Sequence, residues 1–187
     1  MARQQPHEPQ YAPPEEGKLF SERRPKLAIC GHGRSGKDTA GEYLGRITNL
    51  VYCGSMSWAV APLVARDLGL TLEEAWARRH DMREYWYLWC KQYRKDDPSR
   101  LVRLVLSRCD MAVGLRDRDE LYHCARQGLF TGILWIERPG IPEDPTLEFR
   151  QEDVLSLGGT IVLNDGDLHR FYRNLDSVAE SLNLLER

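Results

Sequence analysis

The sequence predicts an α/β fold, a three-layer sandwich in which helices cover both faces of a five-stranded parallel sheet. From Lys26 onward, short apolar runs alternate with amphipathic stretches, which is the pattern of strands joined by crossover helices. The chain has 187 residues, of which 42% are hydrophobic, so it is long enough to bury one core. The sequence contains no internal repeat, and one layered domain therefore accounts for the pattern.

Two parts of the chain differ in composition. Residues 1–24 are polar and rich in proline, and half of the 10 prolines fall within residues 1–25. Such a segment buries too little apolar surface to offset the entropy that it loses on ordering. We therefore expect a flexible N-terminal segment over residues 1–24 and one folded domain over residues 25–187.

The candidate strands are short apolar runs of the length expected for buried parallel strands. In chain order they are Leu27–Cys30, Leu50–Cys53, Met111–Leu115, Ile133–Glu137 and Thr160–Leu163. Helices are expected at Asp38–Ile47, Ser57–Leu68, Leu72–Tyr93, Ser99–Arg108, Arg118–Gln127 and Leu168–Leu185. Two of these helices begin with a capping-box pattern, Thr71 to Glu74 and Asp117 to Glu120.

Composition narrows the class of protein. The formal net charge is −2, which argues against a polycation that binds nucleic acid through bulk charge alone. The 5 cysteines are dispersed and form no CxxC pair, so we expect reduced, intracellular thiols. No run approaches the roughly 18 apolar residues of a membrane span, and the N-terminus lacks the apolar stretch of a signal peptide. These features predict a soluble cytoplasmic protein with no membrane partner.

The most informative motif is a glycine-rich loop between the first strand and the first helix. It reads Gly-His-Gly-Arg-Ser-Gly-Lys-Asp-Thr and contains G-x-x-x-x-G-K. Glycines at this spacing let several backbone amides converge on a phosphate, while the helix presents the positive end of its dipole. The candidate nucleotide-binding residues are therefore Gly31, His32, Gly33, Arg34, Ser35, Gly36, Lys37, Asp38 and Thr39.

The residues around the loop lysine indicate the cofactors. Lys37 is placed to reach the terminal phosphates of a triphosphate, and a hydroxyl or carboxylate just behind it can face Mg²⁺. A strict loop of this class has Ser or Thr directly after the lysine, whereas this chain has Asp38 there and its hydroxyl at Thr39. Both residues are therefore candidate metal ligands, and the expected cofactors are ATP and Mg²⁺.

The same glycines allow a second interpretation. They also spell G-x-G-x-x-G, the fingerprint of a dinucleotide-binding turn in oxidoreductases. That turn requires an acidic residue about 20 positions further on, but the sequence has no Asp or Glu between Glu42 and Asp67. A dinucleotide turn also leaves Lys37 unexplained. The phosphate loop is favoured, and an NAD-dependent oxidoreductase and a nucleotide-binding switch without transfer are its rivals.

The loop carries a resemblance to a known family. The string Gly33–Thr39 resembles the phosphate loop of bacteriophage deoxynucleoside monophosphate kinases and their small P-loop relatives. A second match, Val113-Gly-Leu-Arg-Asp-Arg-Asp-Glu120, resembles the Val-x-Asp-Val-Arg-x-x-x-Glu element of that family. The resemblance covers Lys26 to about Glu137 and implies a P-loop kinase fold and transfer of the γ-phosphoryl group of ATP to a deoxynucleotide. It also implies that Arg116 holds the acceptor or the moving phosphoryl group, and that Glu120 braces the following helix.

One family position is not matched, and one acceptor alternative follows from related kinases. Where the family element has Asp, this chain has Gly114. We therefore expect Asp110, Asp38 or Glu137 to act as the metal ligand or the general base in its place. Related phage kinases phosphorylate 5-hydroxymethyluracil within DNA, and modified DNA is therefore the alternative acceptor. Such an enzyme must flip its target base, and it needs aromatic and basic residues near the acceptor site.

The segment after the second strand is expected to shape the acceptor pocket. Ser55, Ser57 and Trp58 are candidates for contacts to a base and sugar, or else form a helix cap followed by a core tryptophan. On the next helix, an apolar stripe is more typical of a core face than of a base-stacking platform. It is formed by Met82, Trp86, Trp89 and Tyr93.

Polar residues of the same helix complete the list of catalytic candidates. Arg79, His80 and Arg83 either clamp an acceptor phosphate or form a solvated basic face. Asp81 is the candidate acceptor base, or else a local cap or ion-pair partner. The catalytic candidates are thus Lys37, Arg116, Asp81 and Arg83.

Two loops near the carboxyl ends of the later strands are further candidates. Residues 137–146 contain three prolines and a glycine, and they either cover the nucleotide or form a plain connector. Asn164 is a candidate for contact with the adenine, and Asp167 is expected to cap the last helix.

Overall fold

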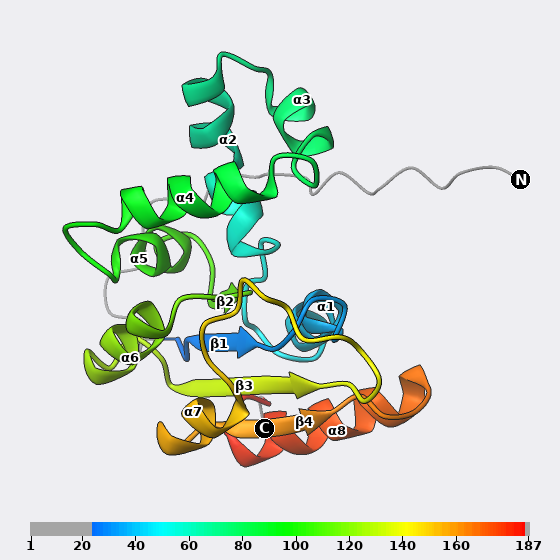
Figure 1. The fold of residues 1–187 in the computed structure, drawn as a ribbon. Helices are drawn as coiled ribbons and strands as arrows, with labels where there is room; N and C mark the ends of the chain where they lie inside the picture. Colours follow the sequence, from blue (N-terminus) through cyan, green and yellow to red (C-terminus); the bar gives the residue numbers. More distant parts are fainter. Residues whose placement is uncertain (1–23, 186–187) are drawn as a thin grey trace, which may run out of the picture.

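Four parallel strands form the sheet of the protein. The computed structural model describes residues 24–185, so the expected flexible segment lies almost entirely outside the described residues. The strands are β1 (Leu27–Cys30), β2 (Met111–Val113), β3 (Gly132–Glu137) and β4 (Thr160–Leu163), in the spatial order β2-β1-β3-β4 (Figure 1). Because all pairs are parallel, the carboxyl ends of the strands meet at one edge, where sheets of this kind bind ligands.

Helices cover both faces of this sheet, as expected. In the described part of the chain they are α1 (Lys37–Ile47), α2 (Met56–Leu68), α3 (Leu72–Ala77), α4 (Arg83–Tyr93), α5 (Arg100–Leu106), α6 (Arg118–Arg126), α7 (Gln151–Ser156) and α8 (Leu168–Ser181). Helices α1 and α8 pack on one face, and α2, α4, α5, α6 and α7 contribute to the core on the other (Figure 1).

Side chains of the strands alternate between two cores. Leu27 and Ile29 of β1 join the core under α1 and α8, whereas Ala28 and Cys30 join the opposite core. All four are fully buried. A strand that is buried on both faces is expected in a parallel sheet, because its neighbours and both helical layers exclude water. The three-layer arrangement predicted from the sequence is therefore confirmed.

The prediction of a fifth strand at Leu50–Cys53 is wrong. Its backbone makes one ladder-like bond to the start of β2, in which the amide of Asp110 donates to the carbonyl of Val51 at 2.8 Å. The amide of Val51 donates instead to the Asp110 carboxylate, also at 2.8 Å. A β-ladder needs repeated bonds between backbone groups, and here a side chain takes one of those places. The segment lies beside the sheet without extending it.

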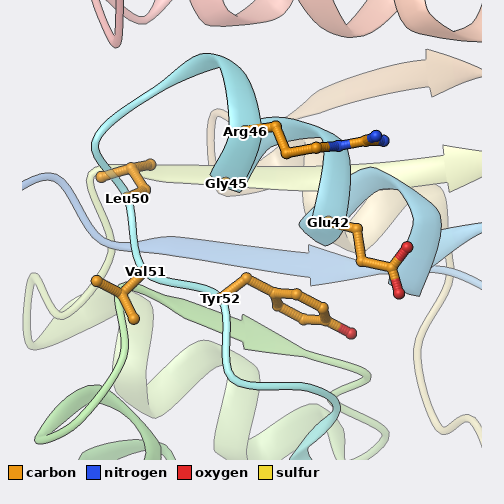
Figure 2. A pocket seen from close by; sticks show the side chains of 6 residues that line it. All are labelled: Glu42, Gly45, Arg46, Leu50, Val51 and Tyr52. Carbon is orange, nitrogen blue, oxygen red and sulfur yellow. The ribbon is translucent and has the colours of Figure 1, made fainter. Parts of the chain in front are cut away.

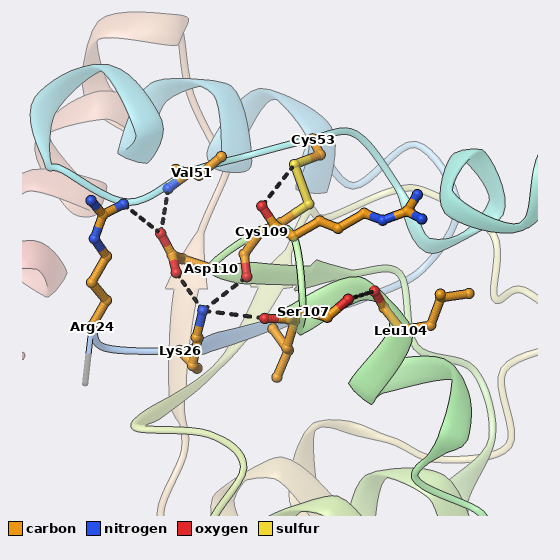
Figure 3. The surroundings of a disulfide bond; sticks show 10 residues. Arg24, Lys26, Val51, Cys53, Leu104, Ser107, Cys109 and Asp110 are labelled. Atoms are coloured by element: carbon orange, nitrogen blue, oxygen red, sulfur yellow. Dashed lines mark hydrogen bonds and ion pairs between the residues drawn. A yellow bond between two sulfur atoms is a disulfide. The ribbon is translucent and has the colours of Figure 1, made fainter. Parts of the chain in front are cut away.

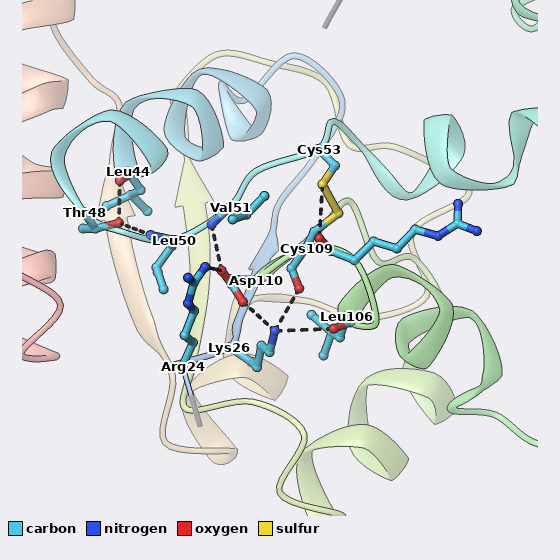
Figure 4. A network of polar contacts seen from close by, with 11 residues as sticks. Arg24, Lys26, Leu44, Thr48, Leu50, Val51, Cys53, Leu106, Cys109 and Asp110 are labelled. Atoms are coloured by element: carbon cyan, nitrogen blue, oxygen red, sulfur yellow. Dashed lines mark hydrogen bonds and ion pairs between the residues drawn. A yellow bond between two sulfur atoms is a disulfide. The ribbon is translucent and has the colours of Figure 1, made fainter. Parts of the chain in front are cut away.

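A cluster of polar contacts at Asp110 holds this edge together (Figure 4). The ammonium group of Lys26 donates to the Asp110 carboxylate at 2.5 Å and to the carbonyl of Cys109 at 3.0 Å. Arg24 adds a longer ion pair at 3.7 Å. These contacts surround the amino end of β2, so Asp110 lies at the opposite end of the strand from the glycine-rich loop.

A disulfide joins the same two segments. Cys53 and Cys109 are bonded, with their Cα atoms 6.0 Å apart (Figure 3). The expectation that all cysteines are reduced is therefore wrong for this pair, while Cys30, Cys90 and Cys124 are free thiols. The contacts between Val51 and Asp110 bring the two cysteines within reach of each other, and a separation of 56 residues gives no sign of that in the sequence.

The expected helix Leu72–Tyr93 is two helices, α3 and α4, joined by a turn. The predicted capping box begins α3, since Thr71 accepts from the amide of Glu74 at 3.2 Å. Trp76 of α3 and Trp86 of α4 then meet edge to face, with ring centroids 6.2 Å apart. In one straight helix, ten residues would separate them by about 15 Å. The turn therefore brings both tryptophans into one cluster.

The remaining differences are small. Helix α7 was not predicted, because six residues are too few to show a clear period. Strand β2 ends at Val113, and Gly114 follows with φ 90°. Asp167 caps α8 as expected, accepting from the amide of Arg170 at 2.8 Å. None of the described helices is both long and apolar enough to cross a membrane.

Candidate functional site

The glycine-rich loop (Gly31–Gly36) connects the carboxyl end of β1 to the start of α1. Gly31 has φ 137°, and a Cβ atom there would lie 2.6 Å from the carbonyl oxygen of Ile136. Gly36 has φ 102°, and its Cβ would lie 2.6 Å from the side-chain nitrogen of Asn164. Both positions therefore require glycine, for backbone conformation and for space. The loop is folded tightly against the ends of β3 and β4.

Helix α1 presents its first turn at the end of this loop. Gly36 is the N-cap, and it provides no side chain to accept from the free amides of the first turn. Helices leave such amides without an internal partner, and an anion can occupy the position. The loop also contains Ser35, whose buried hydroxyl has no hydrogen-bond partner within the described residues. These polar groups fit a bound phosphate.

Lys37 is the first residue of α1, and its side chain turns back over the loop. It is only 9% exposed, and its ammonium group donates to the carbonyl of His32 at 2.5 Å. Burial, together with the nearby charge of Arg116, lowers the pKa of Lys37 to about 8. The ammonium group therefore lies beside the loop, and it forms no ion pair with a carboxylate within residues 24–185.

Two of the predicted arginines meet next to the loop. Arg83 comes from the start of α4, and Arg116 follows β2. Both donate to the same carboxylate oxygen of Asp144, at 2.7 Å and 2.6 Å respectively. These side chains come from elements that are far apart in the sequence. The fold brings both guanidinium groups to one carboxylate oxygen. Three cations, including Lys37, thus surround one end of the glycine-rich loop.

Asp144 is the anion at the centre of this cluster. It belongs to the segment 138–149 between β3 and α7, here called the strap. Its second carboxylate oxygen accepts from the hydroxyl of Thr146 at 2.7 Å, and its backbone amide donates to the His32 ring at 3.1 Å. Burial alone would raise the pKa of Asp144, but hydrogen bonds from Arg116 and Thr146 outweigh it and hold that pKa well below its usual range.

The candidate metal ligands lie on the first turn of α1. Asp38 is exposed, and its carboxylate accepts from the hydroxyl of Tyr52 at 2.9 Å. Thr39 is partly buried one residue further on. Residues 24–185 contain no group of three acidic, histidine or cysteine side chains that could hold a metal by itself. Any Mg²⁺ here would take most of its ligands from phosphate and water, as this ion commonly does.

The other acidic candidates are placed away from the loop or are already engaged. Asp81 is exposed in the turn between α3 and α4. Glu137 accepts from the indole nitrogen of Trp135 at 2.7 Å. Asp110 lies at the amino end of β2, at the opposite end of that strand from Gly114. The structure brings Lys37, Arg83 and Arg116 together, whereas Asp81 makes no hydrogen bond or ion pair with any of them within residues 24–185.

Aromatic side chains of α2 and α3 lie beside Arg79. The guanidinium group of Arg79 lies over the ring of Trp76 at 4.5 Å, and Trp58 meets that ring edge to face at 4.8 Å. Burial lowers the pKa of Arg79, the charge of Asp38 raises it, and the charges of Arg116 and Arg83 lower it further. His80 is exposed in the turn.

The predicted apolar stripe of the α3–α4 region is part of a core. Trp86 is buried, and the remaining members, Met82, Trp89 and Tyr93, pack against the same core. The core interpretation of these residues is therefore confirmed. Ser55 is the N-cap residue of α2, although its side chain does not bond the helix amides.

Sequence reasoning missed Asp144 and did not anticipate the contact that Asn164 makes with the glycine-rich loop. The side chain of Asn164 donates to the carbonyl of Ser35 at 2.8 Å, so it fixes the glycine-rich loop from the end of β4. Asp144 precedes Pro145 and Thr146, a pattern typical of turns in which a side chain bonds the backbone. That pattern could have drawn attention to the strap, but it does not indicate which arginines the carboxylate meets.

A shallow cavity of about 530 Å³ lies on the other side of α1 (Figure 2). It is lined by Glu42, Gly45, Arg46, Leu50, Val51 and Tyr52. Tyr52 packs against Gly41, where a Cβ would come within 2.8 Å of the ring. The hydroxyl of Tyr52 reaches Asp38, so this cavity borders the first turn of α1 but contains none of the clustered cations.

Comparisons with known proteins add little to this geometry. No protein-family model and no curated protein matches the sequence. Among solved structures, the fold is similar to the unliganded crystal structure of a sugar kinase from Janibacter sp. HTCC2649, with a TM-score of 0.42 and 12% sequence identity. The match covers 86% of this chain and 95% of that chain. At this TM-score the similarity carries no argument about function.

Proposed function

We propose that the protein is a P-loop phosphotransferase that moves the γ-phosphoryl group of ATP to an acceptor. The observation that carries the proposal is the convergence of Lys37, Arg83 and Arg116 on the turn of the glycine-rich loop. Phosphoryl transfer depends mainly on positioning and on stabilising negative charge. Three cations from three different elements, next to free helix amides, provide both.

Each group has a role that follows from its place. The amides at the start of α1 and the ammonium group of Lys37 bind the donor phosphates. Arg116 and Arg83 neutralise charge on the transferred group and on the acceptor, because guanidinium forks bind phosphoryl oxygens in pairs. Mg²⁺ supplies further charge neutralisation when bound, and Thr39 and Asp38 are the residues that would hold it.

We propose a deoxynucleotide as the acceptor, with 5-hydroxymethyluracil in DNA as the alternative. The support is the group of aromatic rings at Trp58 and Trp76 beside Arg79, since rings of this kind stack on bases and the guanidinium group adds charge. Free nucleotides and flipped bases share this chemistry. The acceptor itself must be identified by experiment.

The decisive experiment is transfer of label from γ-labelled ATP to a panel of deoxynucleoside monophosphates, unmodified DNA and DNA containing 5-hydroxymethyluracil. We expect label on a monophosphate, whereas label in the polymer alone would select the alternative acceptor. Lys37→Ala should lower turnover by about 100-fold or more, since it removes the positive charge that binds the donor phosphates. Full activity of this variant would reject the site.

A matched control is available at Lys95. This lysine is exposed and lies beyond the end of α4, so Lys95→Ala removes the same charge away from the loop. It should retain wild-type turnover. The rival functions have different outcomes: hydrolysis without a labelled acceptor indicates a nucleotide switch, and binding of NAD without ATP indicates an oxidoreductase.

A further inference from the structure

The strap places a carboxylate where the proposed function needs a phosphoryl group. The Asp144 side chain is only 5% exposed. One of its oxygens lies 3.3 Å from the position that a Cβ on Gly33 would take, so the carboxylate sits directly over the glycine-rich loop. The strap reaches this position from the end of β3, which lies next to β1 in the sheet.

The contacts of this carboxylate are those of a bound phosphoryl oxygen. Arg83 and Arg116 both donate to one oxygen, and the Thr146 hydroxyl donates to the other. The charge of Asp144 also acts on the ammonium group of Lys37, which lies close by. Two guanidinium groups, a hydroxyl and an ammonium group form the usual surroundings of a transferred phosphoryl group.

The strap is built to present this side chain. The backbone amide of Thr146 donates to the Asp144 carboxylate at 3.1 Å, and the amide of Leu147 donates to the Asp144 carbonyl at 3.0 Å. The amide of Asp144 itself donates to His32 within the loop. Three backbone amides therefore hold residues 144–147 in one turn on top of the loop.

We propose that Asp144 is an internal substitute for the phosphoryl group, which holds Arg83 and Arg116 in the nucleotide-free protein and must be displaced when a triphosphate binds. This inference rests on the proposed function, since it assigns the same site to the phosphates. It makes the strap an autoinhibitory element that competes with the donor nucleotide.

Displacement follows from electrostatics. A γ-phosphate and the Asp144 carboxylate on the same guanidinium groups would place like charges within a few ångströms of each other, and the Asp144 side chain is only 5% exposed, so water screens the repulsion poorly at that carboxylate. The two anions therefore exclude each other. The apparent affinity for the nucleotide is therefore the intrinsic affinity multiplied by the fraction of molecules in which Asp144 does not occupy the phosphate position.

Asp144→Asn tests this competition directly, because it removes the charge and keeps the shape. The probe is the non-hydrolysable analogue adenosine 5′-(β,γ-imido)triphosphate, titrated calorimetrically with a metal chelator present. We expect Asp144→Asn to bind it about tenfold more tightly than wild type. Glu143→Gln is the matched control, since Glu143 is an exposed neighbour in the strap, and it should bind like wild type. Unchanged or weaker binding by Asp144→Asn would overturn the inference, and it would make Asp144 an arginine-positioning residue or a metal ligand.

Amide hydrogen exchange of the wild-type protein provides a measurement that does not depend on a folded variant. Binding of the same analogue should speed exchange at residues 144–147 and slow it at residues 33–37. Unchanged or slower exchange at 144–147 would contradict the displacement. If wild type and Asp144→Asn both fail to bind the analogue, the proposed function fails. If wild type binds, Lys37→Ala does not, and Asp144→Asn binds no more tightly than wild type, the proposed function stands and the strap inference fails.

Discussion

Lys37 is a cation in a place where water contributes little to its solvation. Burial, with the charge of Arg116, lowers the pKa of its ammonium group to about 8. The group is therefore mostly charged at pH 7, and it becomes neutral as the pH rises through that value. A triphosphate beside it adds negative charge, which favours the protonated form and raises the pKa.

Nucleotide binding should therefore be coupled to proton uptake. Near pH 8.5 we expect uptake of about half a proton or more per bound triphosphate, falling toward zero at pH 6, and a binding affinity that decreases as the pH rises above about 8. Calorimetry in buffers of different ionisation enthalpy measures this uptake. Lys37→Ala should abolish it, and uptake that persists in that variant would assign the proton to another group.

Lys37 and Arg116 could be identified from the sequence because each belongs to a motif with fixed spacing. Arg83 was one of several arginines on a helix, and its role as a neighbour of Arg116 depends on the turn between α3 and α4. Asp144 escaped detection because its partners lie 28 and 61 residues away in the chain. Local patterns cannot show contacts that only the tertiary fold creates.

At the scale of the elements, one buried ion pair joins the end of α4 to α6. Arg94 is 8% exposed and donates to Glu120 at 2.6 Å and to Asp117 at 3.0 Å. Burial raises the pKa of Glu120, and the charge of Arg94 opposes that rise. The resemblance implied that Glu120 braces the helix that follows it, whereas in the structure Glu120 lies within α6 and links that helix to Arg94 at the end of α4.

Removing one partner of this pair should lower the free energy of unfolding more than removing both. Arg94→Met leaves the buried Glu120 carboxylate without its main donor, and we expect a loss of about 3–5 kcal/mol in the free energy of unfolding. The double variant Arg94→Met/Glu120→Leu should recover much of this loss. Urea denaturation measures both, and equal stability of the single and double variants would show that the pair is not coupled.

Most helices and strands could be predicted from the sequence. The predictions that were wrong have physical causes. Apolar runs and helical periods located all four strands, with β2 two residues shorter than predicted, and most helices, because burial on both faces leaves a continuous apolar signature. The run at Leu50–Cys53 has the same apolar signature. Its Val51 amide, however, donates to the Asp110 side chain and not to the backbone of a neighbouring strand. The break between α3 and α4 follows from tryptophan packing, for which the sequence offers no glycine or proline.

At the scale of the whole molecule, the Cys53–Cys109 disulfide closes a large part of the chain into a loop. That loop contains α2, α3, α4 and α5, together with the turn that holds Arg79, and it includes Arg83, Trp58 and Trp76. A cross-link between residues 56 apart restricts the unfolded chain more than it restricts the fold. The dispersed cysteines alone did not indicate this bond.

Loss of the disulfide should therefore lower stability without changing the glycine-rich loop. Chain-entropy arguments give about 4 kcal/mol for a loop of this length. We expect Cys53→Ser, or treatment with a reducing agent, to lower the urea midpoint, while Cys90→Ser should leave the reduction effect intact. Mass spectrometry before and after alkylation checks the bond, and a midpoint that does not respond to reductant would contradict its structural role.

The central claim is that the glycine-rich loop binds the donor phosphates and that the arginines bind the transferred group. A crystal structure with ADP, Mg²⁺ and aluminium fluoride, a planar mimic of the moving phosphoryl group, tests both halves at once. We expect the β-phosphate against the amides at the start of α1 and the Lys37 ammonium group, the fluoride within hydrogen-bond distance of Arg116, and Asp144 displaced from that guanidinium group. A nucleotide bound elsewhere, with the loop amides and Arg116 making no contact to it, would contradict the account.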